Sequence, residues 1–335
     1  MSKRHTAMLG LFGAALLGTV LLSFLLGRFP IAPGELVRIL WGRLFGLETA
    51  WPEAMEKIVF NIRLPRVGLA CMVGMSLAAA GAAYQSVFQN PMASPDVLGA
   101  SNGAAFGAAL GIWLGMSSRG VTGMAFAMSL VAVGAAFAVS RRAKGKQLLT
   151  LILCGMMLSS LFGAGTSYIK LVADPTNQLP AITYWLMGSL SGATLDDLAF
   201  AAIPMALGLL PLWLTRWKLN ILSMGDDEAR SLGVRPERLR LLATVSATLL
   251  TAASVSVSGV IGWVGLIVPH VARRLVGNDH RVLTPASMLL GAVFLLAVDD
   301  VSRSLLAVEI PIGILTSLLG APFFLWLITR RGDAF

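Results

Sequence analysis

Long apolar stretches, separated by short polar segments, run through the whole chain. Each is near the ~20 residues that an α-helix needs to cross the hydrocarbon core of a bilayer. The pattern predicts ten spanning helices, at about residues 7–27, 63–88, 97–115, 121–139, 147–172, 195–214, 238–258, 260–276, 283–302 and 311–329. Two segments do not fit this pattern of spanning helices. An amphipathic segment within 28–60 predicts an interfacial helix, and 174–192 predicts a half-helix or surface helix.

The stretch at 97–115 carries a glycine at every fourth position, namely Gly99, Gly103, Gly107, Gly111 and Gly115. In water, so many glycines would weaken a helix. In lipid, small residues at this spacing let another helix backbone approach closely. The pattern therefore predicts that this helix packs in the centre of a helix bundle.

The composition also indicates a membrane protein. Of the 335 residues, 56% are hydrophobic and 13% are charged, whereas soluble domains carry roughly 25% charged residues. The mean hydropathy is +0.78. We therefore expect an all-α polytopic membrane protein in which residues 1–335 form a single transmembrane domain.

The net charge of +9 fits this class. Lysine and arginine collect in the cytoplasmic loops of membrane proteins, so the excess does not indicate nucleic-acid binding. With the N-terminus in the cytoplasm, ten alternating spans leave most of the 26 basic residues on that side. This orientation puts the C-terminus and the loop at 215–240 in the cytoplasm too. The apolar stretch 7–27 lacks a convincing cleavage site, which indicates a retained first helix rather than a signal peptide.

The loop at 215–240 is the longest charged segment of the chain. Its centre, Gly225 to Gly233, predicts a short helix. Acidic residues in the first turn favour a helix N-terminus, and glycine is a common stop. Such a helix between two spans lies in water, where it offers a docking surface to a soluble partner. An ordinary solvated loop is the alternative.

No group of residues forms a catalytic or metal-binding pattern. The histidines and cysteines are scattered along the chain: His5, His270, His280, Cys71 and Cys154. No phosphate-binding motif is present, so we expect this chain to hold no metal, no cofactor and no ATP, and not to be an enzyme.

Acidic residues are nearly absent from the middle of the predicted spans. Asp299, Asp300 and Arg303 cluster at the outer end of the 283–302 helix, near the interface. A carrier that works alone on a proton or sodium gradient normally needs mid-membrane carboxylates. A stand-alone secondary transporter is therefore the less favoured alternative, and the driving energy is expected to come from a partner.

Several segments carry a family resemblance, in order along the chain. They are Arg63-Leu64-Pro65-Arg66, residues 89–99 (beginning Gln89-Asn90-Pro91-Met92), residues 259–270 and residues 310–324. The chain resembles the permease subunits of ABC importers for iron-siderophore, haem and cobalamin complexes. This resemblance implies the type II ABC importer permease fold, with about ten transmembrane helices, in a bacterial or archaeal inner membrane.

The resemblance also implies site residues. Residues 225–233 are similar to the coupling helix that docks on the ATPase, with Gly225, Asp226, Asp227, Glu228, Ala229, Leu232 and Gly233 in matching positions. Arg230 departs from that motif, which has a second alanine there. Arg63, Arg66 and Arg303 match outward-facing arginines that meet acidic residues of the binding protein. The turn Asn90-Pro91-Met92 matches part of a cytoplasmic gate.

The same resemblance implies partners. They are two ABC ATPase subunits that bind ATP and Mg, a periplasmic or lipid-anchored substrate-binding protein, membrane lipid and a second permease copy. We expect a homodimer, with a heterodimer as the alternative, and a path lined largely by 147–172 and 311–329. The expected cargo is an iron chelate, either a ferric siderophore or haem. Cobalamin is the alternative within the family.

Overall fold

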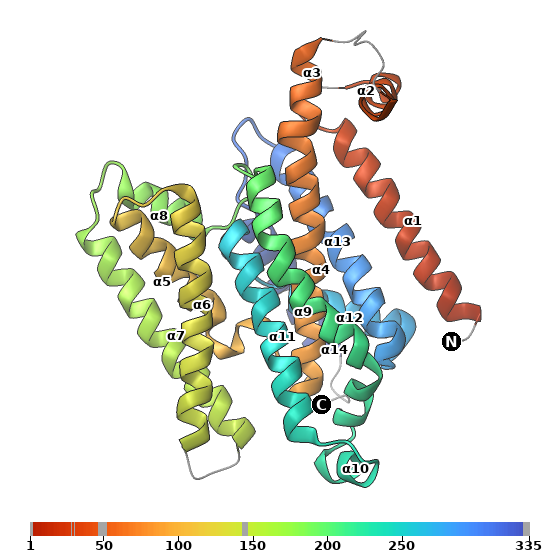
Figure 1. The fold of residues 1–335 in the computed structure, drawn as a ribbon, viewed down its shortest axis with the longest axis vertical. Helices are drawn as coiled ribbons and strands as arrows, with labels where there is room; N and C mark the ends of the chain where they lie inside the picture. The colour runs from red at the N-terminus through yellow and green to blue at the C-terminus, as the bar shows by residue number, and fades with distance from the viewer. Residues whose placement is uncertain (1–2, 28, 30, 46–51, 143–146, 331–335) are drawn as a thin grey trace.

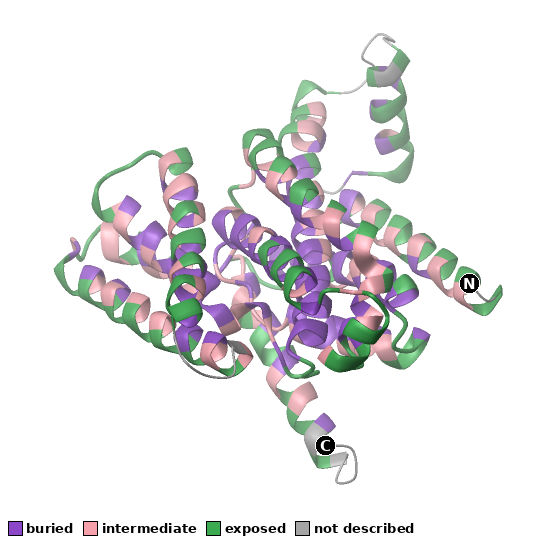
Figure 2. Cartoon of the chain, turned by 60° about the horizontal axis from the view of Figure 1, so that its bottom comes forward, coloured by how far each residue is buried: buried purple, intermediate pink, exposed green. Residues whose placement is uncertain are grey.

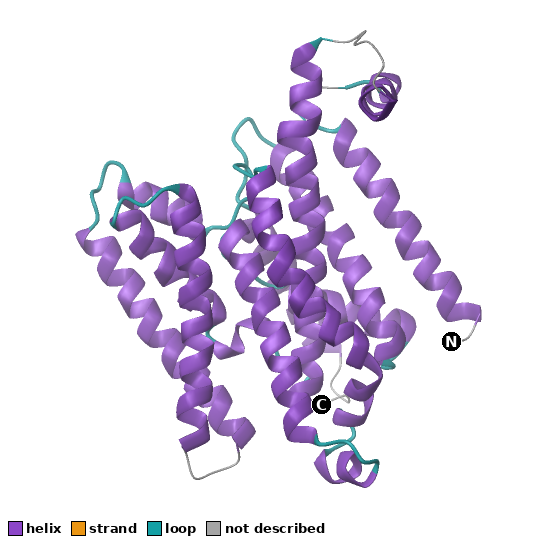
Figure 3. Cartoon of the chain, viewed as in Figure 1, coloured by secondary structure: helices purple, strands orange, loops and turns teal. Residues whose placement is uncertain are grey.

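The computed structural model describes residues 3–27, 29, 31–45, 52–142 and 147–330, and within them it contains helices and no strands (Figure 3). Figure 1 shows their arrangement. The elements are α1 (Lys3–Leu25), α2 (Pro33–Phe45), α3 (Glu53–Lys57), η1 (Ile58–Arg63), α4 (Leu64–Val87), η2 (Pro95–Leu98), α5 (Ala100–Trp113), α6 (Ser118–Arg142), α7 (Gln147–Val172), α8 (Gln178–Leu186), α9 (Leu195–Leu222), α10 (Asp226–Ser231), α11 (Pro236–Ser258), α12 (Val264–Val276), α13 (His280–Ser304) and α14 (Ile312–Arg330).

The predicted all-α membrane fold is confirmed, but the count of ten spans is not. Within the described residues, seven helical stretches are long and apolar enough to cross a membrane. They are α1, the continuous stretch α3–η1–α4, α6, α7, α9, α11 and α13. The other three predicted spans correspond to α5, α12 and α14. The first two have only 14 and 13 residues, and α14 has a shorter apolar part, Ile312–Leu327.

The core of the bundle is formed by α4, α11 and α13. Buried residues make up 78%, 72% and 61% of the apolar windows of their spans, against 17% for α1 and α7. Figure 2 shows this contrast between the central helices and the outer face of α1. In a bilayer the exposed apolar faces of the outer helices can face lipid or the helices of another membrane chain.

The glycine-rich helix α5 does approach another helix closely, but it lies with α6, α7 and α8 beside the core of α4, α11 and α13 and not in the predicted centre of the bundle (Figure 1). A Cβ atom at Gly103 or Gly107 would lie 2.6 or 2.4 Å from a backbone oxygen of α6, so α5 and α6 approach as only glycine allows. The outer members of the pattern, Gly99 and Gly115, have φ angles of 83° and 68° and lie outside the helix. The helix is therefore shorter than predicted, because the two end glycines form turns.

Two other helices begin or end at residues that differ from the prediction. The second span begins ten residues before Arg63, because α3 runs through the π-helical turn η1 into α4. Further along, α9 continues past the predicted end at 214 to Leu222. Its charged residues Arg216 and Lys218 lie over the rings of Trp213 and Trp217, at 4.1 and 5.4 Å from the ring centroids. Their charge therefore does not end the helix.

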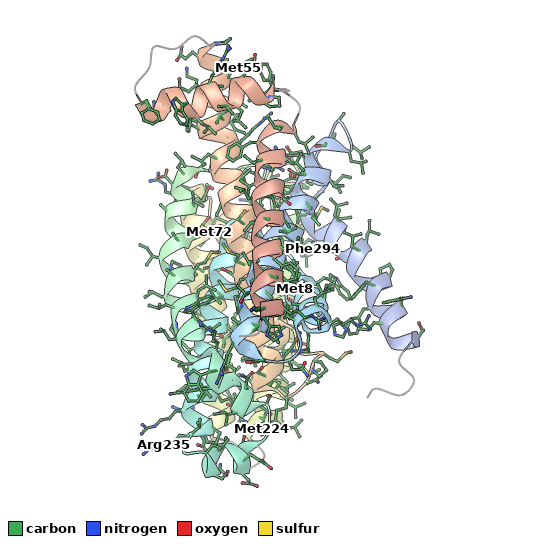
Figure 4. All side chains as sticks on the ribbon, turned by 90° about the vertical axis from the view of Figure 1, so that its right-hand side faces the viewer. Met8, Met55, Met72, Met224, Arg235 and Phe294 are labelled. Atoms are coloured by element: carbon green, nitrogen blue, oxygen red, sulfur yellow. The ribbon has the colours of Figure 1, made fainter. Side chains whose placement is uncertain are left out.

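The two ends of the bundle differ. In Figure 1, α10 lies at the same end as the start of α1, the end of α6 and the start of α7, and we name this the inner end. Helices α2 and α8 lie at the opposite, outer end. Figure 4 shows the same polarity, with Met224 and Arg235 flanking α10 at the bottom and Met55 at the top. The predicted interfacial helix is α2, which buries Leu36 and Ile39 and exposes Trp41.

Candidate functional site

Helix α10 at the inner end is the short helix predicted from the charged loop. It begins after Gly225, which has a φ of 128°, and ends before Gly233, which has a φ of 75°. The N–H of Val234 donates to the carbonyl of Ala229 (2.9 Å), and the N–H of Gly233 donates to that of Arg230 (3.0 Å). These two bonds form a Schellman motif, in which glycine takes the left-handed position.

Ion pairs join α10 to the start of α11. Asp226 pairs with Arg240 at 2.7 Å, and Arg230 pairs with Glu237 at 2.6 Å. Arg230, which stands where the family motif has an alanine, thus helps to hold α10 against α11. Outside these contacts, the Asp227 side chain is 97% exposed and Leu232 is 58% exposed. The short helix is confirmed, and its coupling role stays a prediction.

The turn at Asn90–Met92 lies beside the end of α9. The Asn90 side chain accepts a hydrogen bond from the backbone N–H of Met92 (2.8 Å), which fixes the turn. The preceding residue, Gln89, has a φ of 49° and donates from Nε2 to the carbonyl of Leu222 (3.1 Å). Because α9 leads directly into α10, this bond links the predicted gate turn to the predicted coupling helix. Sequence reasoning did not identify Gln89 as that link.

At the outer end, Arg66 is held between two carboxylates. Its Nε and Nη2 donate to Asp299 at 2.9 to 3.1 Å, and Nη1 and Nη2 donate to Glu309 at 3.0 Å each. The Asp299 side chain is fully buried and that of Glu309 is 23% exposed. These contacts tie α4, α13 and the segment before α14 together.

Arg63 and Arg303 bind the end of α1. Arg303 donates to the carbonyls of Ser23 (2.6 Å) and Leu26 (3.0 Å) and contacts Asp300, and Arg63 donates to the carbonyl of Phe24. The last carbonyls of a helix have no partner within it. The two arginines supply donors to these carbonyls and so attach α1 to the core.

The structure corrects the expectation of outward-facing arginines. Arg63, Arg66 and Arg303 do lie together at the outer end, but they are only 4 to 6% exposed and bind groups of their own chain. Their docking role is untested, and it would require these charges to be released. Sequence reasoning missed two partners of the cluster, Glu309 and Ser23.

His280, one of the scattered histidines, lies between two helices. It is the first residue of α13 and only 2% exposed. Its Nε2 lies 2.6 Å from the Ser86 hydroxyl, and its Nδ1 lies 3.2 Å from the Thr284 hydroxyl. The imidazole therefore joins α4 to α13. In the described part of the chain, no three His, Cys, Asp or Glu residues are grouped so as to hold a metal ion.

Known proteins are similar to this chain in sequence and in fold. A model of the FecCD transport family matches residues 15–330. The chain is 40% identical to the molybdate import system permease protein MolB of Haemophilus influenzae, over 94% of this chain and 93% of that protein. It is 43% identical to a probable iron chelatin transport system permease protein of Helicobacter pylori, over 83% and 84% of the two chains.

A solved structure has a similar fold over nearly the whole length of this chain. It is described as an inward-facing conformation of a putative metal-chelate type ABC transporter, and it is 37% identical to this chain with a TM-score of 0.87. The match covers 97% of this chain and 99% of the other. With the match over residues 15–330, the chain belongs to the FecCD transport family, whose members are permease subunits of ABC importers.

Proposed function

We propose that this permease imports an iron chelate, a ferric siderophore or haem. A substrate-binding protein, periplasmic or lipid-anchored, would deliver the cargo at the outer end. Two ATPase subunits, which carry ATP and Mg, would act at the inner end. The similarity to an iron chelatin permease supports this cargo, and the similarity to a molybdate permease makes molybdate the second candidate. Cobalamin stays the alternative from the family resemblance.

The observation that carries the proposed coupling is the exposed face of α10. This helix is pinned to α11 by ion pairs and presents Asp227 and Leu232 to solvent. A helix fixed on one side and free on the other is suited to transmit a push from a soluble partner. The inner end would then be cytoplasmic, with both termini on that side of the inner membrane.

A route from α10 to the gate turn follows from the contacts. Movement of α10 would pull the end of α9, and the bond from Gln89 to Leu222 would pass that movement to Asn90–Met92. A second permease copy, as a homodimer, would complete the path along α7 and α14. Both helices expose apolar side chains that a second copy would cover, such as Met157 and Leu318.

Uptake into proteoliposomes tests the cargo. The permease would be reconstituted with its ATPase and binding protein, and uptake of a labelled ferric chelate, haem, molybdate and cobalamin would be compared with and without ATP. We expect ATP-dependent uptake of the iron chelate above the others. Preferred uptake of molybdate or cobalamin would replace the proposed cargo, and uptake without ATP or ATPase would contradict the mechanism.

A substitution at Gly233 tests the coupling role. Gly233→Val places a β-branched residue at a φ of 75°, which costs about 1–3 kcal/mol. Because this strain falls on the Schellman motif that ends α10, we expect ATP-driven uptake to fall about tenfold, the change that corresponds to 1.4 kcal/mol. Gly233→Asn is the matched control, since asparagine tolerates this conformation. Equal, normal uptake by both variants would make the segment a plain linker.

A further inference from the structure

A cavity of about 500 Å³ opens at the inner end between the ends of four helices. The last turns of α4 and α12, the end of α9 and the start of α13 form its walls. Its lining includes Arg273, Arg274, Asn278, Gln85 and Asn90. A volume of this size holds a small organic ligand rather than a single water molecule.

The charge of this cavity is positive. Its described lining contains no aspartate or glutamate. Arg273 and Arg274 take part in none of the ion pairs found among the described residues. By contrast, Arg230 and Arg240, at the same end, are paired with carboxylates. Arg274 lies over the ring of Trp326, 5.8 Å from its centroid, a contact that leaves its charge unneutralised. Both arginines therefore keep their charge available for an anion.

The nearest carboxylate in sequence, Asp279, is used elsewhere. It accepts hydrogen bonds from the backbone N–H of Arg281 (2.9 Å) and from the Asn220 side chain (2.7 Å). Partial burial acts to raise the pKa of the Asp279 carboxyl, but these hydrogen bonds outweigh it and hold that pKa below its usual value. Asp279 thus stays ionised as the cap of α13 and does not neutralise the cavity.

Hydrogen bonds between elements fix the walls. Gln89 is bound to Leu222, Ser86 to His280, and the backbone N–H of His280 to Asn220. In the conformation of this structure the walls are therefore ordered before a ligand binds, which lowers the conformational cost of binding.

The wall also includes a polar group with an open hydrogen-bonding position. Gln85 is 3% exposed, its Oε1 has no hydrogen-bond partner, and its Nε2 is only 3.5 Å from the carbonyl of Gly265. The oxygen is an acceptor and would not bind a phosphate oxygen, but Nε2 has a second N–H besides the one directed at Gly265, and this one can donate to a ligand. A helix C-terminus alone would explain basic residues in α12, but it does not explain why a buried amide beside them has an oxygen without a partner.

We propose that this cavity binds a phosphate group through Arg273 and Arg274. Guanidinium groups match the geometry and charge of phosphate oxygens. The phosphate could be free in solution or part of the headgroup of an anionic lipid such as phosphatidic acid, since both present the same oxygens. This site lies beside the predicted gate turn, since Asn90 belongs to both, whereas no residue of α10 lines it.

Equilibrium dialysis with labelled inorganic phosphate tests the site on the whole permease, without ATPase, in phosphatidylcholine nanodiscs. We expect the variant Arg273→Gln/Arg274→Gln to bind phosphate at least about tenfold more weakly, because each charged hydrogen bond typically contributes that much. Arg281→Gln is the matched control. It removes the same charge from an exposed residue at the same end that does not line the cavity.

A second arm uses nanodiscs that contain phosphatidic acid. If this lipid blocks phosphate binding to the unmodified permease, the headgroup is the ligand; if it does not, the free anion is. Two results would overturn the proposal. One is that phosphate fails to bind in phosphatidylcholine and phosphatidic acid gives no thermal stabilisation that depends on Arg273 and Arg274. The other is that Arg281→Gln weakens binding as much as the double variant, which would indicate a general charge effect.

Discussion

Replacing Arg66 by leucine is expected to lower the stability of the purified permease by about 3–5 kcal/mol, the usual result of removing one partner of a buried ion pair. The reason is Asp299, which is fully buried and would lose the guanidinium that contacts both of its oxygens. Among the described residues, the one ion pair left to Asp299 would be the contact with Arg303 at 3.8 Å. The measurement is the midpoint of thermal unfolding in detergent, which should fall by about 10 °C for a chain of this size.

Two further variants test whether the loss of stability comes from the buried pair of Arg66 with Asp299. Glu309→Gln should cost much less, because this side chain is partly exposed and an amide still accepts hydrogen bonds from Arg66. In Arg66→Leu/Asp299→Leu, no carboxylate is left buried without its partner, so part of the lost stability should return. If Arg66→Leu unfolded at the same temperature as the unmodified permease but lost capture of the binding protein, Arg66 would act as a free docking charge.

Sequence patterns predicted the long helices well. The range 147–172 agrees with α7 at both ends, because a charged segment precedes it and a polar segment with Asp174 and Pro175 follows it. The ranges 97–115 and 260–276 were too long. Each contains residues with positive φ within the apolar pattern, Gly99 in the first and Trp263 in the second, and hydropathy does not distinguish a turn from a helix.

The two candidate sites differ in how far the sequence could predict them. The α10 segment was predictable because its signals are local: acidic residues in the first turn and a glycine at the end. The outer cluster joins residues far apart in the chain, since Arg66 and Glu309 are separated by 243 positions. A single sequence contains the charges of such a cluster but not their pairing, so burial of the arginines could not be foreseen.

Close contact between helix backbones explains why parts of this fold admit no side chain at all. Helix α4 crosses α12 where Gly81 meets Gly265, and it crosses α13 where Gly74 meets Gly291. A Cβ atom at Gly81 would lie 1.8 Å from the carbonyl oxygen of Gly265, and one at Gly74 would lie 2.2 Å from that of Gly291. Flexible side chains can yield to such a clash, but helix backbones in a packed core yield little.

Gly81→Ala is therefore expected to cost more than the roughly 1–3 kcal/mol of ordinary overpacking. To make room, α12 would have to move away from α4, which disturbs the contacts of both with α13. Gly123→Ala in α6 is the matched control, because a Cβ atom there has no neighbour within 4 Å. The measurement is the yield of monodisperse protein and its unfolding midpoint in detergent, and we expect loss of folded protein for Gly81→Ala and little change for Gly123→Ala. Equal stability of the two variants would mean that α4 and α12 are not in backbone contact, and the wall of the inner cavity that α12 contributes would then lie elsewhere.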